Sequence, residues 1–234
     1  MSVEIKCKYC DVKNLSCFNR INTDDLDYLN SIKKSNLYKK GQDIFYEGMR
    51  PTGVYCLYSG KIKIFKLGID GKEQIVRFAT PGNLLGIRAL ISGREYSASA
   101  STLEDSVVCF IDRRTFLKLT VKYPYLSHCL MITLTKLLEE AENKLTSLAQ
   151  KGVRERLAET LIVLSNVFKY ENPTNNMPVI SLTRLDLSNI VGTATETVIR
   201  LLSEFKDEGL VEIKGRKITL VDIKGLKRAG KILI

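Results

Sequence analysis

The stretch LTRLDLSNIVGTATETVIRLLSEFKDEGLVEIKGRKITL, residues 182–220, carries the most informative pattern of the chain. Residues 183–190 predict a short helix that opens with a possible capping pair, Thr183 and Asp186. Gly192 marks a turn, after which residues 195–210 predict a second helix that Gly209 ends as a C-cap. Residues 211–221 predict two short strands around a glycine. The stretch therefore predicts helix, turn, helix and hairpin. The inward-facing residues of the second helix are Val198, Leu201, Leu202 and Phe205.

Upstream of this stretch, residues 125–150 predict a long helix with a narrow apolar stripe. A narrow stripe on a long helix favours packing against a second copy of itself, although packing on its own β domain is the alternative. Gly152 interrupts the pattern, and helical spacing resumes over residues 153–168. The predicted dimer seam is Leu134, Leu137, Ala141, Leu145 and Leu148.

Residues 37–111 have a β-strand pattern. The segment KIKIFK, residues 61–66, alternates charged and apolar residues, and Asp70-Gly71 is a hairpin-turn dipeptide. Many short strands separated by glycine turns predict an all-β sandwich or jelly roll in this part of the chain.

The composition is that of an ordinary globular protein. The chain has 234 residues, of which 44% are hydrophobic and 26% charged, and its net charge is +10. This basic surplus suggests nucleic acid or an anionic membrane surface as a partner, with a Lys-rich soluble surface as the plain alternative. No apolar run reaches the roughly 18 residues of a membrane span, and the first residues are polar. We therefore expect a cytoplasmic protein with no membrane partner.

Residues 182–220 resemble the winged helix-turn-helix of the CRP/FNR transcription regulators, most specifically in GTATETVIRLL. PGNLLGIRALISG resembles the family's sensor barrel, and the helix at 125–150 resembles its dimerisation helix. The resemblance implies an α+β chain: an N-terminal cysteine cluster (1–22), a cyclic-nucleotide-binding-type β barrel or jelly roll (23–124), a dimerisation helix (125–151) and a winged helix-turn-helix (152–234). It also implies a bacterial homodimer that binds palindromic double-stranded promoter DNA, with RNA polymerase as a partner.

Two side chains of the second helix suit base recognition. Arg can donate twice to guanine and Glu can accept from cytosine, and Glu196 and Arg200 are four residues apart on one face. They fall on the family's positions for the G and C of a TGA core. The alternatives are a capping box of Glu196 with Thr193 and a surface ion pair of Arg200 with Glu196 or Glu204. Further predicted DNA contacts are Thr195 and Ile199 near the bases, and Thr183, Lys214, Arg216 and Lys217 at phosphates.

The sequence departs from the cAMP-binding branch of the family at its ligand positions. Gly86 is followed by Ile87 instead of Glu, and the expected Arg falls at Tyr96, before Ser97. A phosphate buried without a charge partner is costly, so we expect no cyclic nucleotide to bind.

The FNR branch of the family fits better, because its sensor segment aligns without a gap. The resemblance implies that Cys7, Cys10, Cys17 and Cys109 hold a [4Fe–4S] cluster sensitive to oxygen or NO. The second gap of the N-terminal cysteine motif is one residue longer than in enterobacterial FNR. Zn²⁺ and unligated, reduced thiols are the alternatives. Cys56 and Cys129 lie in apolar patterns and are expected in the core or the seam.

The residue inventory speaks against catalysis. His128 is the only histidine, and the chain has no phosphate-binding glycine loop, plausible triad or kinase signature. We therefore predict a sequence-specific transcription regulator and no enzyme. The alternative is a regulator with the same DNA-binding function that has no cluster and responds to haem, to a small effector or to no ligand.

Overall fold

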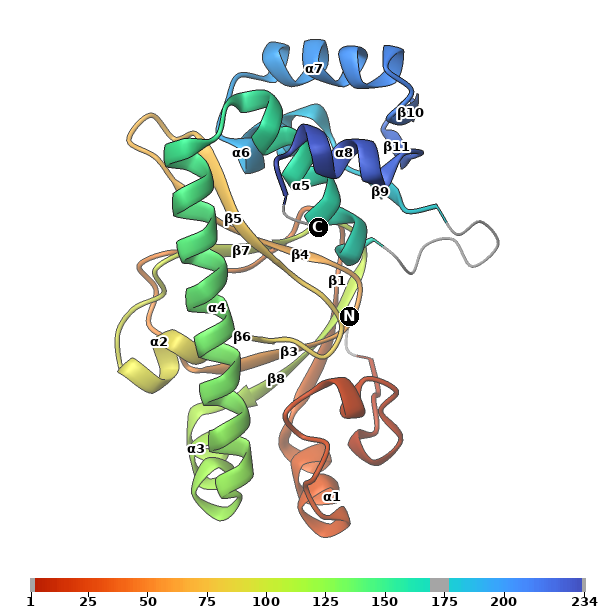
Figure 1. Cartoon of the computed structure of the whole chain (residues 1–234). Helices are drawn as coiled ribbons and strands as arrows, with labels where there is room; N and C mark the ends of the chain where they lie inside the picture. Colours follow the sequence, from red (N-terminus) through yellow and green to blue (C-terminus); the bar gives the residue numbers. More distant parts are fainter. Residues whose placement is uncertain (1–2, 169–176, 233–234) are drawn as a thin grey trace. The chain divides into compact units, whose positions relative to one another are not determined.

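The computed structural model describes residues 3–168 and 177–232 (Figure 1). The chain divides into two compact units, Met1–Gly68 with Val76–Glu139, and Ile69–Ile75 with Glu140–Ile234. The division falls inside the long helix α4 (Pro124–Gln150). Within the described ranges, no helix combines the length and the apolar character needed to cross a membrane.

The first unit is built on two four-stranded sheets, as predicted for a β sandwich. One has the order β1 (Lys34–Tyr38), β8 (Ser106–Asp112), β3 (Gly53–Ser59) and β6 (Leu84–Leu85), and its neighbours pair antiparallel. The other has the order β2 (Asp43–Phe45), β7 (Ser99–Thr102), β4 (Ile62–Leu67) and β5 (Glu73–Ala79). In β4 the alternation has its expected effect, since Ile62 and Ile64 are buried.

Helical segments complete this unit. The N-terminal segment contains the 3₁₀ turns η1 (Cys7–Tyr9) and η2 (Lys13–Leu15), followed by α1 (Thr23–Ile32). The side chain of Asn22 caps α1 by accepting from the Asp25 amide at 2.8 Å. The other helices are α2 (Ile87–Ser92), α3 (Arg113–Lys122) and the first part of α4. Leu29, Phe116 and Leu126 belong to one buried cluster, which joins α1, α3 and α4.

The second unit contains the predicted helix, turn, helix and hairpin. Its elements are α5 (Val153–Val167), β9 (Val179–Ser181), α6 (Arg184–Val191), α7 (Thr195–Asp207), β10 (Val211–Lys214), β11 (Lys217–Leu220) and α8 (Ile223–Ala229). The three strands form one sheet in the order β10-β11-β9. β9 and α8 were not predicted.

Candidate nucleic-acid interface and thiol site

The turn between α6 and α7 is fixed by local hydrogen bonds. The Thr183 hydroxyl accepts from the Asp186 amide at 2.9 Å, which confirms the predicted N-cap of α6. Gly192 ends α6 with φ of 73°, a left-handed conformation that favours glycine. At the end of α7, the Leu210 amide donates to the Phe205 carbonyl and the Gly209 amide to the Lys206 carbonyl. This pair of bonds is a Schellman motif, so Gly209 ends α7 as expected.

Helix α7 has one buried and one exposed face. Val198, Leu201, Leu202 and Phe205 are all buried. Glu196, Ile199 and Arg200 are exposed on the opposite side, at the i, i+3 and i+4 spacing that brings side chains together. Ser203 and Lys206 continue this exposed face and were missed, although the same helical spacing could have found them.

Arg200 has a partner within its own helix. Its guanidinium forms an i,i+4 ion pair with Glu204, as one of the sequence alternatives proposed, and its side chain is 65% exposed. Exposed pairs of this kind contribute about 0.3–0.5 kcal/mol, so Arg200 can exchange Glu204 for another acceptor at little cost. Thr195 is half-buried, and its hydroxyl lies 3.1 Å from that of Ser188.

The hairpin β10–β11 carries the predicted basic tip. Lys214, Arg216 and Lys217 are all exposed. Arg184, at the start of α6, donates to the Gly215 carbonyl at 3.2 Å and so ties the tip of the hairpin to the helix-turn-helix. This contact was not predicted. Thr183 donates its hydroxyl to the Asp186 carboxylate at 2.6 Å, so capping already engages it.

The long helix α4 exposes apolar side chains along one stripe. Among the predicted seam residues, Ala141, Leu145 and Leu148 are exposed, whereas Leu134 and Leu137 are half-buried. Met131 and Leu138 are 58% and 60% exposed. A stripe through 131, 134, 138, 141, 145 and 148 has the alternating three- and four-residue spacing of a coiled-coil seam. Leu137 lies beside this stripe and Leu138 on it.

Four cysteine side chains line one cavity in the first unit. They are Cys7, Cys10, Cys56 and Cys109, and all four are free thiols. Cys56 and Cys109 lie directly opposite each other on β3 and β8. The apolar residues Val12, Phe18, Leu26, Leu29 and Ile111 are part of the same lining.

Cys17 is not in this group. The structure joins it to Cys129 of α4 in a disulfide, with Cα atoms 5.8 Å apart. The predicted ligand set, which included Cys17 and left out Cys56, therefore differs from the set that the fold brings together. The alternative of reduced, unligated thiols likewise does not hold for Cys17 in this structure. Sequence spacing grouped Cys17 with its neighbours in the chain, whereas the fold turns it towards α4.

Burial raises the pKa of three of these thiols. It raises the pKa of Cys7 to about 11, with nearby Lys33 acting in the opposite direction, and it also raises the pKa values of Cys10 and Cys56. In residues 3–168 and 177–232, no three cysteine, histidine, aspartate or glutamate side chains are grouped closely enough for a single metal ion. A four-iron cube is larger than an ion and binds thiolates spaced around it, which suits cysteines on separate walls of a cavity.

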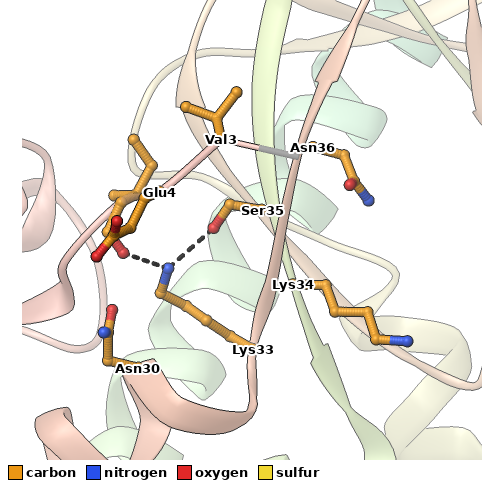
Figure 2. Close-up of a pocket in the computed structure, with 8 residues that line it drawn as sticks. Val3, Glu4, Asn30, Lys33, Lys34, Ser35 and Asn36 are labelled. Atoms are coloured by element: carbon orange, nitrogen blue, oxygen red, sulfur yellow. Dashed lines mark hydrogen bonds between the residues drawn. The ribbon is translucent and has the colours of Figure 1, made fainter. Parts of the chain in front are cut away.

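A second cavity of about 380 Å³ adjoins the N-terminal segment and contains polar and basic side chains (Figure 2). Lys33 lines both cavities. Its ammonium donates to the Ile5 carbonyl at 2.5 Å and to the Ser35 hydroxyl at 2.9 Å. Val3 also donates from its amide to the Ser35 carbonyl at 2.9 Å. These bonds hold the N-terminal segment against β1.

The interior of the β sandwich holds an aromatic pair that includes Tyr96, the position where the cAMP-binding branch has arginine. Tyr96 is buried and stacks on Phe45, with ring centroids 4.0 Å apart. Ser97 accepts a hydrogen bond from Arg88. Tyr96 therefore occupies the expected arginine position with an uncharged ring.

A β-sandwich unit, a long helix and a helix-turn-helix with a basic hairpin define a DNA-binding transcription regulator. Residues 36–123 match the family model of the cyclic nucleotide-binding domain, and residues 155–229 match that of the Crp-like helix-turn-helix domain. The chain is 30% identical over 221 residues to the transcriptional activator protein FnrA of Stutzerimonas stutzeri, covering 94% of this chain and 90% of that protein.

Other relatives agree. The fumarate and nitrate reduction regulatory protein of Escherichia coli is 32% identical over 217 residues, or 92% of this chain and 86% of that protein. The solved structure of FixK2 from Bradyrhizobium japonicum has a TM-score of 0.76 at 24% identity and shares the fold over 87% of this chain and 100% of that one. The chain belongs to the CRP/FNR family of transcription regulators. Its named relatives are regulators, and it is not an enzyme.

Proposed function

We propose that the protein is a homodimeric, sequence-specific regulator that reads a palindrome with a TGA core. The observation that carries this proposal is the exposed face of α7, where Glu196 and Arg200 project together. A recognition helix in the major groove can pair Arg200 with the guanine and Glu196 with the cytosine of one base step. Lys214, Arg216 and Lys217 on the adjacent hairpin would contact phosphates, which position the protein without reading sequence.

The dimer is supported by the exposed stripe of α4. Leucines exposed at 138, 145 and 148 would be costly to leave in water on a helix of 27 residues. A second copy of the same helix would bury them in a symmetric seam. Two recognition helices related by that symmetry match a palindromic site, and relatives called transcriptional activators point to RNA polymerase as a further partner.

For the signal, we propose a [4Fe–4S] cluster held through Cys7, Cys10 and Cys109, with oxygen or NO as the input. Three of the four predicted ligands line one cavity whose lining is otherwise mostly apolar, and soft thiolate donors suit such a cluster. When bound, the cluster supplies a centre that oxygen or NO can destroy. The chain's own thiols give up their protons to ligate it.

The N-terminal segment is linked to the helix that carries the proposed seam. The Tyr125 hydroxyl, at the start of α4, donates to the Cys17 carbonyl at 2.7 Å and accepts from the Arg20 amide at 2.9 Å. Phe18 and Leu126 share one buried cluster. A movement of the segment would therefore alter its contacts with α4. We expect cysteine ligation to control the dimer through these contacts.

Three measurements test the proposal. Anisotropy titration should show tight binding to a TGA…TCA palindrome and much weaker binding when the G·C pair of each half-site is exchanged, with light scattering reporting a dimer. Iron and acid-labile sulfide should both be present at about four per chain in anaerobically purified protein. Binding that ignores the G·C exchange would contradict the reading of α7, and protein free of iron would contradict the cluster.

A further inference from the structure

The cluster proposal leaves one ligand open, because the disulfide with Cys129 removes Cys17 from the thiols available in this structure. We propose that Cys56 supplies the fourth thiolate, beside Cys7, Cys10 and Cys109, and that the Cys17–Cys129 pair stays outside the site. This inference rests on the proposed function and assigns a ligand within it.

The sheet supplies two of the four thiols. Cys56 of β3 and Cys109 of β8 are directly opposed, and Ser35 of β1 is opposed to Cys109 on its other side. Directly opposed residues of antiparallel strands project from the same face. The three side chains therefore form a row across the sheet, and the Ser35 hydroxyl lies 3.3 Å from the Cys109 sulfur. Cys56 and Cys109 both reach the cavity.

The N-terminal segment supplies the other two thiols, Cys7 and Cys10, to the lining of the same cavity. The Cys10 amide donates to the Cys7 carbonyl at 3.4 Å, which closes the turn between them. The Cys7 amide donates to the Asn30 side chain of α1 at 3.2 Å, so the turn is anchored to the folded unit. One rigid sheet and one anchored turn thus each contribute a pair of cysteines to the same cavity.

The surroundings suit an anionic group of this kind. Lys33 lines the cavity and carries a positive charge close enough to influence Cys7. Four thiolates would add negative charge to a mostly apolar site, and a nearby ammonium offsets part of the resulting electrostatic cost.

Cys17 is engaged on the other side of its segment. Besides its disulfide with Cys129, its carbonyl accepts from Tyr125 and its sulfur lies 4.0 Å from the Thr133 hydroxyl of α4. It does not line the cavity of the four thiols. For Cys17 to ligate there, its bond to Cys129 would first have to be reduced.

The test compares iron and sulfide in anaerobically reconstituted variants. Cys56→Ser should lose nearly all the iron, as should Cys7→Ser, Cys10→Ser and Cys109→Ser, whereas Cys17→Ser and Cys129→Ser should retain about four per chain. Circular dichroism checks that Cys56→Ser is folded, and Cys56→Ala provides a second replacement without a hydroxyl.

A wild-type measurement keeps the test independent of folding. The cluster-loaded protein is unfolded anaerobically in guanidinium at neutral pH with excess N-ethylmaleimide, and its peptides are mapped by mass spectrometry. We expect the Cys17–Cys129 cross-linked peptide in near-stoichiometric yield and Cys56 alkylated. Alkylated Cys17, together with iron retained by Cys56→Ser and lost by Cys17→Ser, would overturn the assignment while leaving the cluster in place. Wild-type protein that binds no iron would overturn both.

Discussion

Arg200→Ala is the substitution that most sharply separates base reading from general attraction to DNA. Arg200 is exposed, and its one described ion pair is with Glu204 in the same helix. Truncating it removes a pair whose contribution to stability is about 0.3–0.5 kcal/mol, so the fold should be unaffected. On DNA the same change removes two hydrogen bonds to a guanine edge in each half-site.

The expected magnitude follows from these contacts. A bidentate base contact contributes about 1–3 kcal/mol of discrimination, which is about a 5- to 150-fold change in affinity per half-site. Breaking the Arg200–Glu204 ion pair when DNA binds costs a few tenths of a kcal/mol. We therefore expect the loss of affinity in Arg200→Ala to lie in the lower half of this range. The free-energy losses at the two half-sites should add, because the half-sites are independent. Glu204→Gln is the matched control, because it frees Arg200 and removes a negative charge near the DNA, and it should preserve or strengthen binding.

The assay is anisotropy titration of wild type, Arg200→Ala and Glu204→Gln on the TGA palindrome and on a palindrome with the G·C pairs exchanged. The wild type should discriminate between the two DNAs, and Arg200→Ala should bind the TGA palindrome more weakly and keep only the part of the discrimination that Glu196 contributes at the cytosine. If Arg200→Ala kept the full discrimination of the wild type, Arg200 would not read the guanine, and the placement of α7 as recognition helix would be wrong.

Three further predictions concern the hairpin, the seam and the thiols. Lys214→Ala should weaken binding to all sequences alike and lower the slope of log affinity against log salt by about 1, and a sequence-dependent loss would refute its role at a phosphate. Leu145→Glu should yield monomers in light scattering, because it places a charge opposite its symmetry mate in the seam. The control Thr146→Glu, at the exposed neighbouring position, should stay dimeric. A dimeric Leu145→Glu would exclude this seam. Because burial raises the pKa of Cys7 to about 11, its alkylation in metal-free protein should be slow at pH 8 and accelerate as the pH rises towards 11, and fast labelling at pH 7 would contradict this.

Local signals in the sequence were enough to predict the helix-turn-helix. Thr183, Gly192 and Gly209 act through hydrogen bonds and backbone angles within a few residues, so their roles are visible in the order of amino acids. β9 was missed because it has three residues and depends on pairing with β11, more than 30 positions further along the chain. α8 was missed because it is short and contains Gly225 within its span, a residue that weakens a helical pattern.

The thiol site shows where sequence spacing fails. Cys7 and Cys10 were grouped correctly because a CxxC turn is local. Cys56 packs against a buried cluster, as expected, but its place beside Cys109 in the cavity was missed because it depends on the register of β3 and β8, which spacing does not reveal. The same limit applies on α4, where Leu137 and Leu138 are adjacent in sequence and only their exposure shows which one lies on the stripe.

The central claim is that ligation of the N-terminal cysteines controls binding to the palindrome. It is tested most directly by titrating the TGA palindrome with one anaerobic preparation before aeration, after aeration and after anaerobic reconstitution with iron and sulfide. The proposal predicts tight binding with iron present, a fall in affinity as iron is lost, and recovery of both together. Equal affinity in all three samples, with no iron in the anaerobic one, would contradict the proposal and leave a DNA-binding regulator whose signal lies elsewhere.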